Sequence, residues 1–330
     1  MTFVAFLGII GSFLASSLKF STVFLFGATG EIINQKSGHL NMGTPGIMYF
    51  GAIGGILGEM LYAFNVPAEA LNPILVVLIP VIFAAIFGAI GGAIFSFFTV
   101  TLHCNQNVIG LTLTTFAVGI AHMAIAEIAK LPDFAKLSKA GLMMQSAFPA
   151  LKGSILLEQS WFTYLGIAVA VIAAIVITKT RVGLNLRAVG ENAAAADSAG
   201  INVNAYRYIA TIIGGAIAGI GGAFFELDQC KGMFSAADGV DSFGWLALCI
   251  VIFSMWKPLI AIGASYLFAC LSVLPDFLPP LIGCPGWASE LLRMIPYIAT
   301  LIVLIIVSIF NSKKNQPPAN LGLSYFREDR

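Results

Sequence analysis

The stretch from Lys179 to Arg207 reads KTRVGLNLRAVGENAAAADSAGINVNAYR and is a polar segment that lies between long apolar segments. Within it, Asn192 can cap a helix by accepting a hydrogen bond from a backbone N–H, the alanines from Ala193 onward are strong helix formers, and Gly200 can supply a left-handed stop. The pattern predicts a helix of about two turns. Isolated helices need roughly 12–15 residues to be stable in water, so this one must be held by the rest of its chain and by a docking surface.

The composition around this stretch excludes a soluble domain. Of 330 residues, 58% are hydrophobic and only 10% are charged, and the mean hydropathy is +0.93. Soluble domains usually carry about a quarter charged residues. Water is absent from the bilayer core, so the long apolar runs predict an all-α, polytopic transmembrane bundle. The net charge of +1 gives no support to a nucleic-acid partner.

We expect about ten membrane segments, with eight to ten as the range. Several are shorter than the roughly 20 residues needed to span a bilayer, so the second and the eighth could be broken or re-entrant. Together they form a transmembrane domain of residues 1–311, which contains a cytoplasmic loop at 179–206 and is followed by a polar cytoplasmic tail at 312–330. The expected segments are 3–18, 20–34, 41–63, 74–99, 107–130, 160–178, 207–226, 243–256, 259–274 and 294–311.

Lysines and arginines set the expected orientation. When the 179–206 loop is placed inside and the segments alternate, the cytoplasmic side carries more of these residues than the outer side. The sign agrees with the positive-inside tendency of membrane proteins. Both termini are then expected in the cytoplasm.

Two motifs carry a resemblance to a known family. GLNLRAVGENAAAADSAGINV followed by a Gly-rich helix resembles the cytoplasmic coupling loop of ABC importer permeases, in the branch with sugar, branched-chain amino acid and nucleoside permeases. The tail PPANLGLSY resembles the P-x-x-LG-x-x-Y ending of the nucleoside-type permeases, which work with a basic-membrane-protein-like lipoprotein. The alternative is an ordinary cytosolic loop with a stray helix. The resemblance implies a coupling element that docks in a cleft of the ATP-binding subunit, formed by Arg187, Gly190, Glu191, Asn192, Ala195, Ala196 and Gly200.

A second informative stretch, from Gly30 to Glu59, reads GEIINQKSGHLNMGTPGIMYFGAIGGILGE. A short polar turn links two apolar helices, and Pro45 would break the start of the second one. One interpretation is an interrupted helix that lines a translocation path, and the other is a tight hairpin with a proline in the first helical turn. The resemblance to nucleoside-type permeases favours the path. Those permeases commonly carry Glu-Gly where this chain has Pro45–Gly46, which leaves the substrate class open.

The stretch NQNVIGLTLTTFAVGI, from Asn105 to Ile120, places threonines among apolar residues. Threonines in membrane helices usually bond their own backbone carbonyls, although they could also line a polar path. In the family that this chain resembles, this helix is thought to face the pathway. The candidate residues of the translocation path are Asn41, Thr44, Pro45, Thr112, Thr115 and Phe116.

Glycines spaced four residues apart predict close helix crossings. The pairs are Gly51/Gly55, Gly88/Gly92 and Gly215/Gly219. Each pair exposes bare backbone on one helix face. We expect packing there and no ligand.

Ionisable and metal-ligating residues are few. Four glutamates fall near predicted helix ends: Glu31, Glu59, Glu127 and Glu226. We expect them to lie at the water interface, and Glu31 is the first candidate for an exception. Neither the histidines nor the five cysteines have metal-ligand spacing. No phosphate-binding loop, flavin or NAD fingerprint, or nucleophile–base pair is present. We therefore expect no metal site, no cofactor bound by this chain and no enzyme activity of its own.

These features lead to one functional hypothesis with alternatives. The resemblance implies a permease subunit of an ABC importer in a bacterial cytoplasmic (inner) membrane, with a nucleoside as the favoured solute. ATP and Mg would bind a separate ATP-binding subunit. A second homologous permease (in a heterodimer), an extracytoplasmic substrate-binding lipoprotein and membrane lipid would be the other partners. Alternatives are a permease for a sugar, riboflavin or a branched-chain amino acid, and an ion-coupled secondary transporter.

Overall fold

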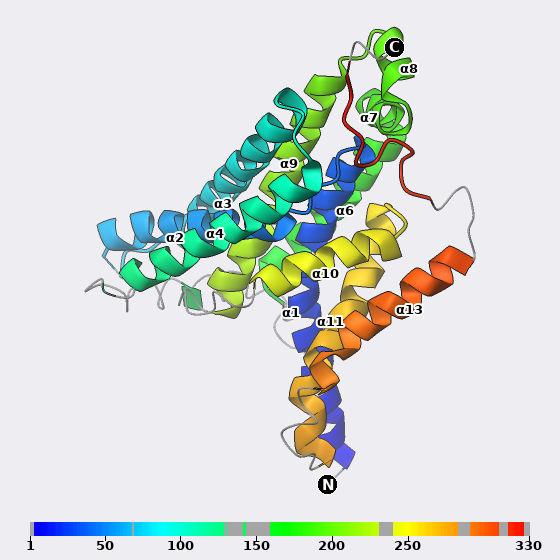
Figure 1. Cartoon of the computed structure of the whole chain (residues 1–330). Coiled ribbons are helices and arrows are strands. Elements are labelled where there is room, and N and C mark those ends of the chain that lie inside the picture. The colour runs from blue at the N-terminus through cyan, green and yellow to red at the C-terminus, as the bar shows by residue number, and fades with distance from the viewer. Residues whose placement is uncertain are drawn as a thin grey trace.

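The computed structural model describes residues 3–67, 69–128, 130, 141–142, 159–230, 240–282, 291–309 and 316–326. Within these ranges every regular element is a helix, so the all-α prediction is confirmed (Figure 1). The N-terminal half contains α1 (Phe3–Lys36), α2 (Thr44–Asn65), α3 (Pro73–Ser96), the π-helical turn η1 (Phe97–Thr101) and α4 (Gln106–Ile128).

The C-terminal half places two short helices between longer ones. Its elements are α6 (Trp161–Lys179), α7 (Arg181–Glu191), α8 (Ala193–Ser198), α9 (Val203–Phe224), the π-helical η3 (Phe225–Gln229), α10 (Val240–Phe253), α11 (Pro258–Ile282) and α13 (Ile295–Ile309).

The described residues do not confirm the expected count of about ten membrane segments. Seven helices of the described residues are long and apolar enough to cross a membrane, and two shorter apolar helices cover Ser242–Phe253 and Leu291–Val303. The first two predicted segments, 3–18 and 20–34, are one continuous helix, α1. A single charge such as Lys19 breaks no backbone hydrogen bond, so it does not interrupt the helix.

The continuity of α1 places its two ends far apart in the molecule. The last residue of α1, Lys36, lies beside Gly190 of α7, and Gly190 accepts a hydrogen bond from the tail at Asn320. A helix of 34 residues is about 51 Å long. The start of α1 therefore lies at the opposite end of the molecule from the tail (Figure 1). Neither end is assigned to a side of the membrane by this arrangement, so the cytoplasmic placement of both termini stays a prediction.

Bare backbone brings α9 against α2 and α3. A methyl group added at Gly88 of α3 would collide with the carbonyl oxygen of Gly215 on α9, and one at Gly51 of α2 would collide with Gly219. Contacts this close are open only to glycine, and they maximise dispersion between helices. The predicted close crossings are confirmed, and they make α2, α3 and α9 one compact unit that supports the coupling loop.

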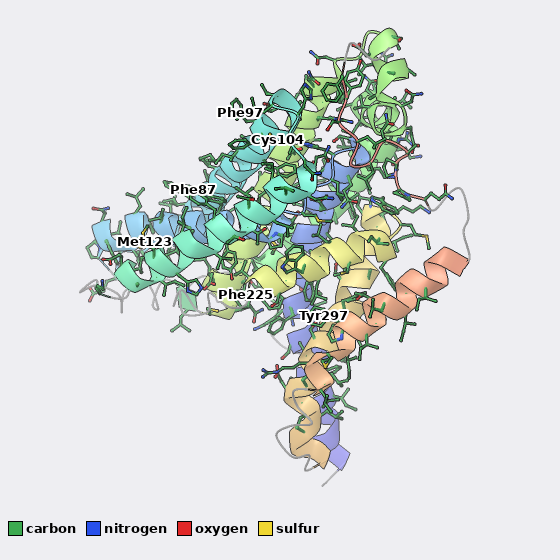
Figure 2. All side chains as sticks on the ribbon, in the orientation of Figure 1. Phe87, Phe97, Cys104, Met123, Phe225 and Tyr297 are labelled. Carbon is green, nitrogen blue, oxygen red and sulfur yellow. The ribbon has the colours of Figure 1, made fainter. Side chains whose placement is uncertain are left out.

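The outer surface is largely apolar. On α3, a row of isoleucine and leucine side chains points away from the bundle, from Ile74, which is 72% exposed, to Ile90, which is 46% exposed. Met123 on α4 and Tyr297 on α13 are also exposed (Figure 2). Such a surface fits contact with lipid tails.

Candidate functional site

The coupling loop folds as two short helices, α7 and α8. The Asn192 side chain caps α8, because its Oδ1 accepts a hydrogen bond from the Ala195 N–H at 3.0 Å. Gly200 follows with φ +84°, and the Ile201 N–H donates to the Ala196 carbonyl at 3.0 Å. This pairing satisfies a carbonyl at the helix end. The predicted cap and stop are confirmed.

Packing holds α8 in place. Ala193 and Ala196 are buried against Val189 of α7 and Val203 of α9. An isolated helix of six residues would not persist in water. Its stability therefore comes from the two neighbouring helices, as the sequence predicts.

The predicted coupling residues divide by exposure. Gly190 and Ala196 are buried, Arg187 is half-buried, and the others face outward: Glu191, Asn192, Ala195 and Gly200. The outward face is small and carries almost no side-chain bulk at Ala195. A partner protein could approach the α8 backbone closely there.

A buried polar network begins next to this loop, at Glu31. The Glu31 side chain is 2% exposed. Its Oε1 accepts from Gln35 Nε2 at 2.9 Å, and its Oε2 accepts from the Thr44 hydroxyl at 2.8 Å. The Asn41 N–H also donates to Oε1, at 3.3 Å. Donors from both sides of the α1–α2 turn thus stabilise one buried carboxyl group.

The network continues into α9 and to the start of α11. Thr211 Oγ1 donates to Asn34 Oδ1 at 2.6 Å and lies 2.9 Å from His39 Nδ1. Trp256 Nε1 donates to Gln35 Oε1 at 2.6 Å. Three distant parts of the chain therefore meet at the end of α1, which makes the α1–α2 turn a junction of the fold.

His39 is neutral inside this network. It lies in the turn between α1 and α2 and is fully buried. Burial, reinforced by the nearby Arg207 charge, lowers the pKa of His39 from 6.5 to about 3. Because the Thr211 hydroxyl donates to Asn34, it accepts at His39, so the proton of the neutral ring sits on Nδ1.

The structure separates the predicted path residues into two groups. Asn41 and Thr44 belong to the polar network, and Pro45 packs directly against Gly244 of α10. Pro45 lies in the first turn of α2, which runs unbroken from Thr44 to Asn65. The structure thus has the tight hairpin, and not the interrupted helix.

The second group lies on the outward face of α4. Thr112, Thr115 and Phe116 are exposed. The Thr112 and Thr115 hydroxyls donate to the carbonyls of Val108 and Leu111, four residues back, at 2.8 and 3.0 Å. These bonds satisfy the hydroxyl protons within the helix, while a second lone pair on each oxygen stays open to a solute.

Two of the glutamates expected at the water interface lie elsewhere. Glu59 is 2% exposed and Glu226 is fully buried, so the prediction is wrong for them. The reason is helix length, because α2 runs on to Asn65 and α9 continues as η3 to Gln229. Glu127 is exposed and pairs with Lys130 at 2.7 Å, as expected of an interfacial residue. Glu31 is the buried exception that the sequence predicts.

Sequence reasoning missed several network members. Thr211 of α9, Gln106 of α4 and Trp256 of the α10–α11 turn all lie far from the α1–α2 turn in sequence. Thr211 is a single threonine in a Gly-rich helix, and its neighbours in sequence do not show that its hydroxyl bonds to a distant side chain. The one available signal was the density of amide side chains at Asn34–Gln35, which exceeds what a lipid-facing helix end needs.

Comparison with known proteins places the chain in a family. The family model described as "Branched-chain amino acid transport system / permease component" matches residues 13–307. The nucleoside ABC transporter permease protein NupC of Lactococcus lactis is 30% identical, with 95% of this chain and 96% of NupC covered. The guanosine ABC transporter permease protein NupQ of Bacillus subtilis is 29% identical, with 96% of each chain covered.

A third relative has a different solute in its name. The glucose ABC transporter permease protein TsgB13 of Haloferax volcanii is 28% identical, with 83% of this chain and 71% of TsgB13 covered. All three relatives are permease proteins of ABC transporters. With its family model matched over nearly the full length and with helices that suit a bilayer, this multi-pass membrane protein belongs to the branched-chain amino acid transport system/permease component family.

Proposed function

We propose that the chain is the transmembrane permease subunit of an ABC importer, and that α8 is its coupling helix. The observation that carries the proposal is α8 itself, a capped helix that is held on α7 and α9 and presents Ala195 outward. A protruding helix with little side-chain bulk suits insertion into a cleft of a partner. In this proposal the coupling-loop end of the molecule faces the cytoplasm, and the ATP-binding subunit, with its ATP and Mg, is a separate protein.

The solute path would run along α4, between this permease and a second, homologous one. The exposed faces of α3 and α4 differ in chemistry. On α3 the exposed large side chains are aliphatic, which suits lipid. The exposed face of α4 also carries large apolar side chains, but Thr112 and Thr115 lie among them. Polar groups in a bilayer usually face protein or a water-filled cavity. The α4 face is therefore the better candidate for the path, and a second permease would enclose it from the other side.

A nucleoside is the solute that the relatives favour. NupC and NupQ, the two relatives that span nearly the whole chain at about 30% identity, are named for nucleoside and guanosine transport. A sugar is the second candidate, because TsgB13 is named for glucose. Capture outside the membrane would fall to a separate substrate-binding lipoprotein.

Competition for uptake tests the proposal. Cells that express the chain with an ATP-binding subunit, a second permease and a binding lipoprotein should take up tritiated guanosine, and cells that lack the chain should not. Unlabelled nucleosides should compete for this uptake, while glucose should not. Uptake should stop when ATP is depleted and persist when the ion gradient is collapsed. Competition by glucose alone would move the assignment to a sugar. Loss of uptake with the gradient while ATP persists would point to an ion-coupled secondary transporter.

A further inference from the structure

The C-terminal tail lies along the coupling loop and joins it to the α1–α2 turn (Figure 1, red trace). The Asn320 N–H donates to the Gly190 carbonyl at the end of α7, at 3.0 Å. Two residues later, the Gly322 N–H donates to the Gly38 carbonyl in the α1–α2 turn, also at 3.0 Å. One short segment therefore bonds to both structures through its main chain.

The same tail reaches α8 through a side chain. The Tyr325 hydroxyl donates to Asp197 Oδ2 at 2.8 Å, a charge-assisted bond of the stronger kind. The Tyr325 ring also packs against the cluster that holds α8 on its neighbours. Beyond it, the Phe326 ring lies 4.5 Å from the ring of His103, between η1 and α4. The tail thus contacts α8, the α1–α2 turn and the η1–α4 connection.

The contact between the tail and α8 matters because few other parts of the chain contact α8. Among the described helices, α8 packs on α7 and α9. The α1–α2 turn, by contrast, carries His39 and is bonded into the buried network around Glu31 through Asn41. Through the tail, α8 is connected to the α1–α2 turn and from there to the buried carboxyl group of Glu31.

We propose that residues 319–326 are a positioning strap, which holds α8 and the α1–α2 turn in fixed register so that a displacement of α8 reaches the buried polar network. The inference rests on the proposed function, because it assigns the strap to the coupling step. Tyr325 is its positioning residue. The main-chain bonds survive most substitutions, whereas the Tyr325–Asp197 bond is removed by deleting one oxygen atom.

The first test needs no transport. In the purified full-length chain with an N-terminal tag, hydrogen exchange should quicken in Tyr325→Phe at the amides of both α8 and residues 38–41. Tyr297→Phe is the matched control, since it makes the same change on α13, where Tyr297 is exposed, and it should leave both regions unchanged. Faster exchange confined to the tail would overturn the strap, because α8 and the turn would then be held without it.

The second test separates the strap from the proposed function. Proteoliposomes that contain the chain with its ATP-binding subunit and second permease enclose ATP, the binding protein and tritiated guanosine are added outside, and the ATP hydrolysed per guanosine imported is measured. Tyr325→Phe and Asp197→Asn should each assemble and hydrolyse ATP, yet raise this ratio severalfold, and the double variant should be no worse than either single one. An unchanged ratio in an importing complex would overturn the strap alone. A wild-type complex that hydrolyses ATP without importing guanosine would overturn the proposed substrate.

Discussion

At the scale of single residues, Gly38 is the point where four parts of the chain meet. Its φ is +81°, and a methyl group added there would lie 3.3 Å from both the Asn320 carbonyl oxygen and the Gly190 Cα, and 3.5 Å from Arg207 Nη2. A left-handed backbone in so crowded a place requires glycine. The α1–α2 turn, the coupling loop, the tail and α9 are therefore fixed relative to each other at one residue.

His39, the next residue, makes stability depend on pH. Its pKa is about 3 in the folded chain, against 6.5 ordinarily, so below pH 6.5 the unfolded state binds a proton that the folded state does not. Stability from this group is complete above pH 6.5 and falls as the pH drops toward 3. At pH 5 the loss is roughly 2 kcal/mol. Thermal unfolding in detergent should shift less between pH 7 and pH 5 in His39→Gln than in the wild type, and an equal shift would contradict the buried neutral ring.

Residue-level prediction worked where the signal was local. Asn192 and Gly200 predict the two ends of α8, because N-capping and a left-handed residue that ends a helix both depend on residues that are neighbours in sequence. The burial of Glu59 and Glu226 depends on how far α2 and η3 extend and on which helices cover them. No local pattern carries that information.

At the scale of elements, α8 is the described α-helix whose stability depends most on packing against its neighbours, because it has only six residues. Removing its cap with Asn192→Ala should cost about 1 kcal/mol, which corresponds to roughly fivefold faster hydrogen exchange within α8. Asn202→Ala is the matched control, because Asn202 caps the long helix α9 through the Ala205 N–H, also at 3.0 Å. That change should leave exchange in α8 as it was. Equal exchange of α8 in wild type and Asn192→Ala would show that packing alone sets its stability.

The α4 face makes a second prediction at this scale. Thr115→Ala should alter the affinity or rate of guanosine uptake without lowering the amount of protein in the membrane, because the exposed hydroxyl bonds only within its own helix. Thr178→Ala on α6 removes a hydroxyl with the same internal bond, to the Ala174 carbonyl at 2.6 Å, and should leave uptake unchanged. If both variants transport like the wild type, the α4 threonines have only a structural role.

Segment boundaries were the least predictable feature of the elements. The apolar runs predict helices correctly, but Lys19 suggested an end within α1 that the backbone does not have. A charged side chain breaks no backbone hydrogen bond, so a hydropathy pattern alone does not show where a helix ends. The two segments expected at 3–18 and 20–34 are therefore one helix.

At the scale of the whole molecule, the polar network and the coupling loop lie at one end, and the exposed apolar surfaces of α3 and α13 lie along the sides (Figures 1 and 2). The class of fold and the family were predictable, because composition and two motifs carry them. The meeting of α1, α9, the α10–α11 turn and the tail at one turn was not predictable, since it joins residues separated by most of the chain.

The central claim is that α8 docks on a separate ATP-binding subunit, and co-purification tests it most directly. The N-terminally tagged chain is isolated from its native membrane beside Ala195→Arg and a matched control, Ala70→Arg, which places the same bulk on an exposed alanine of the α2–α3 connection. The wild type and the control should each bring an ATP-binding subunit and a second permease. Ala195→Arg should insert normally yet lose the ATP-binding subunit or hydrolyse ATP without transport. A chain that repeatedly comes alone in mild detergent, or an Ala195→Arg variant with normal uptake, would contradict the account.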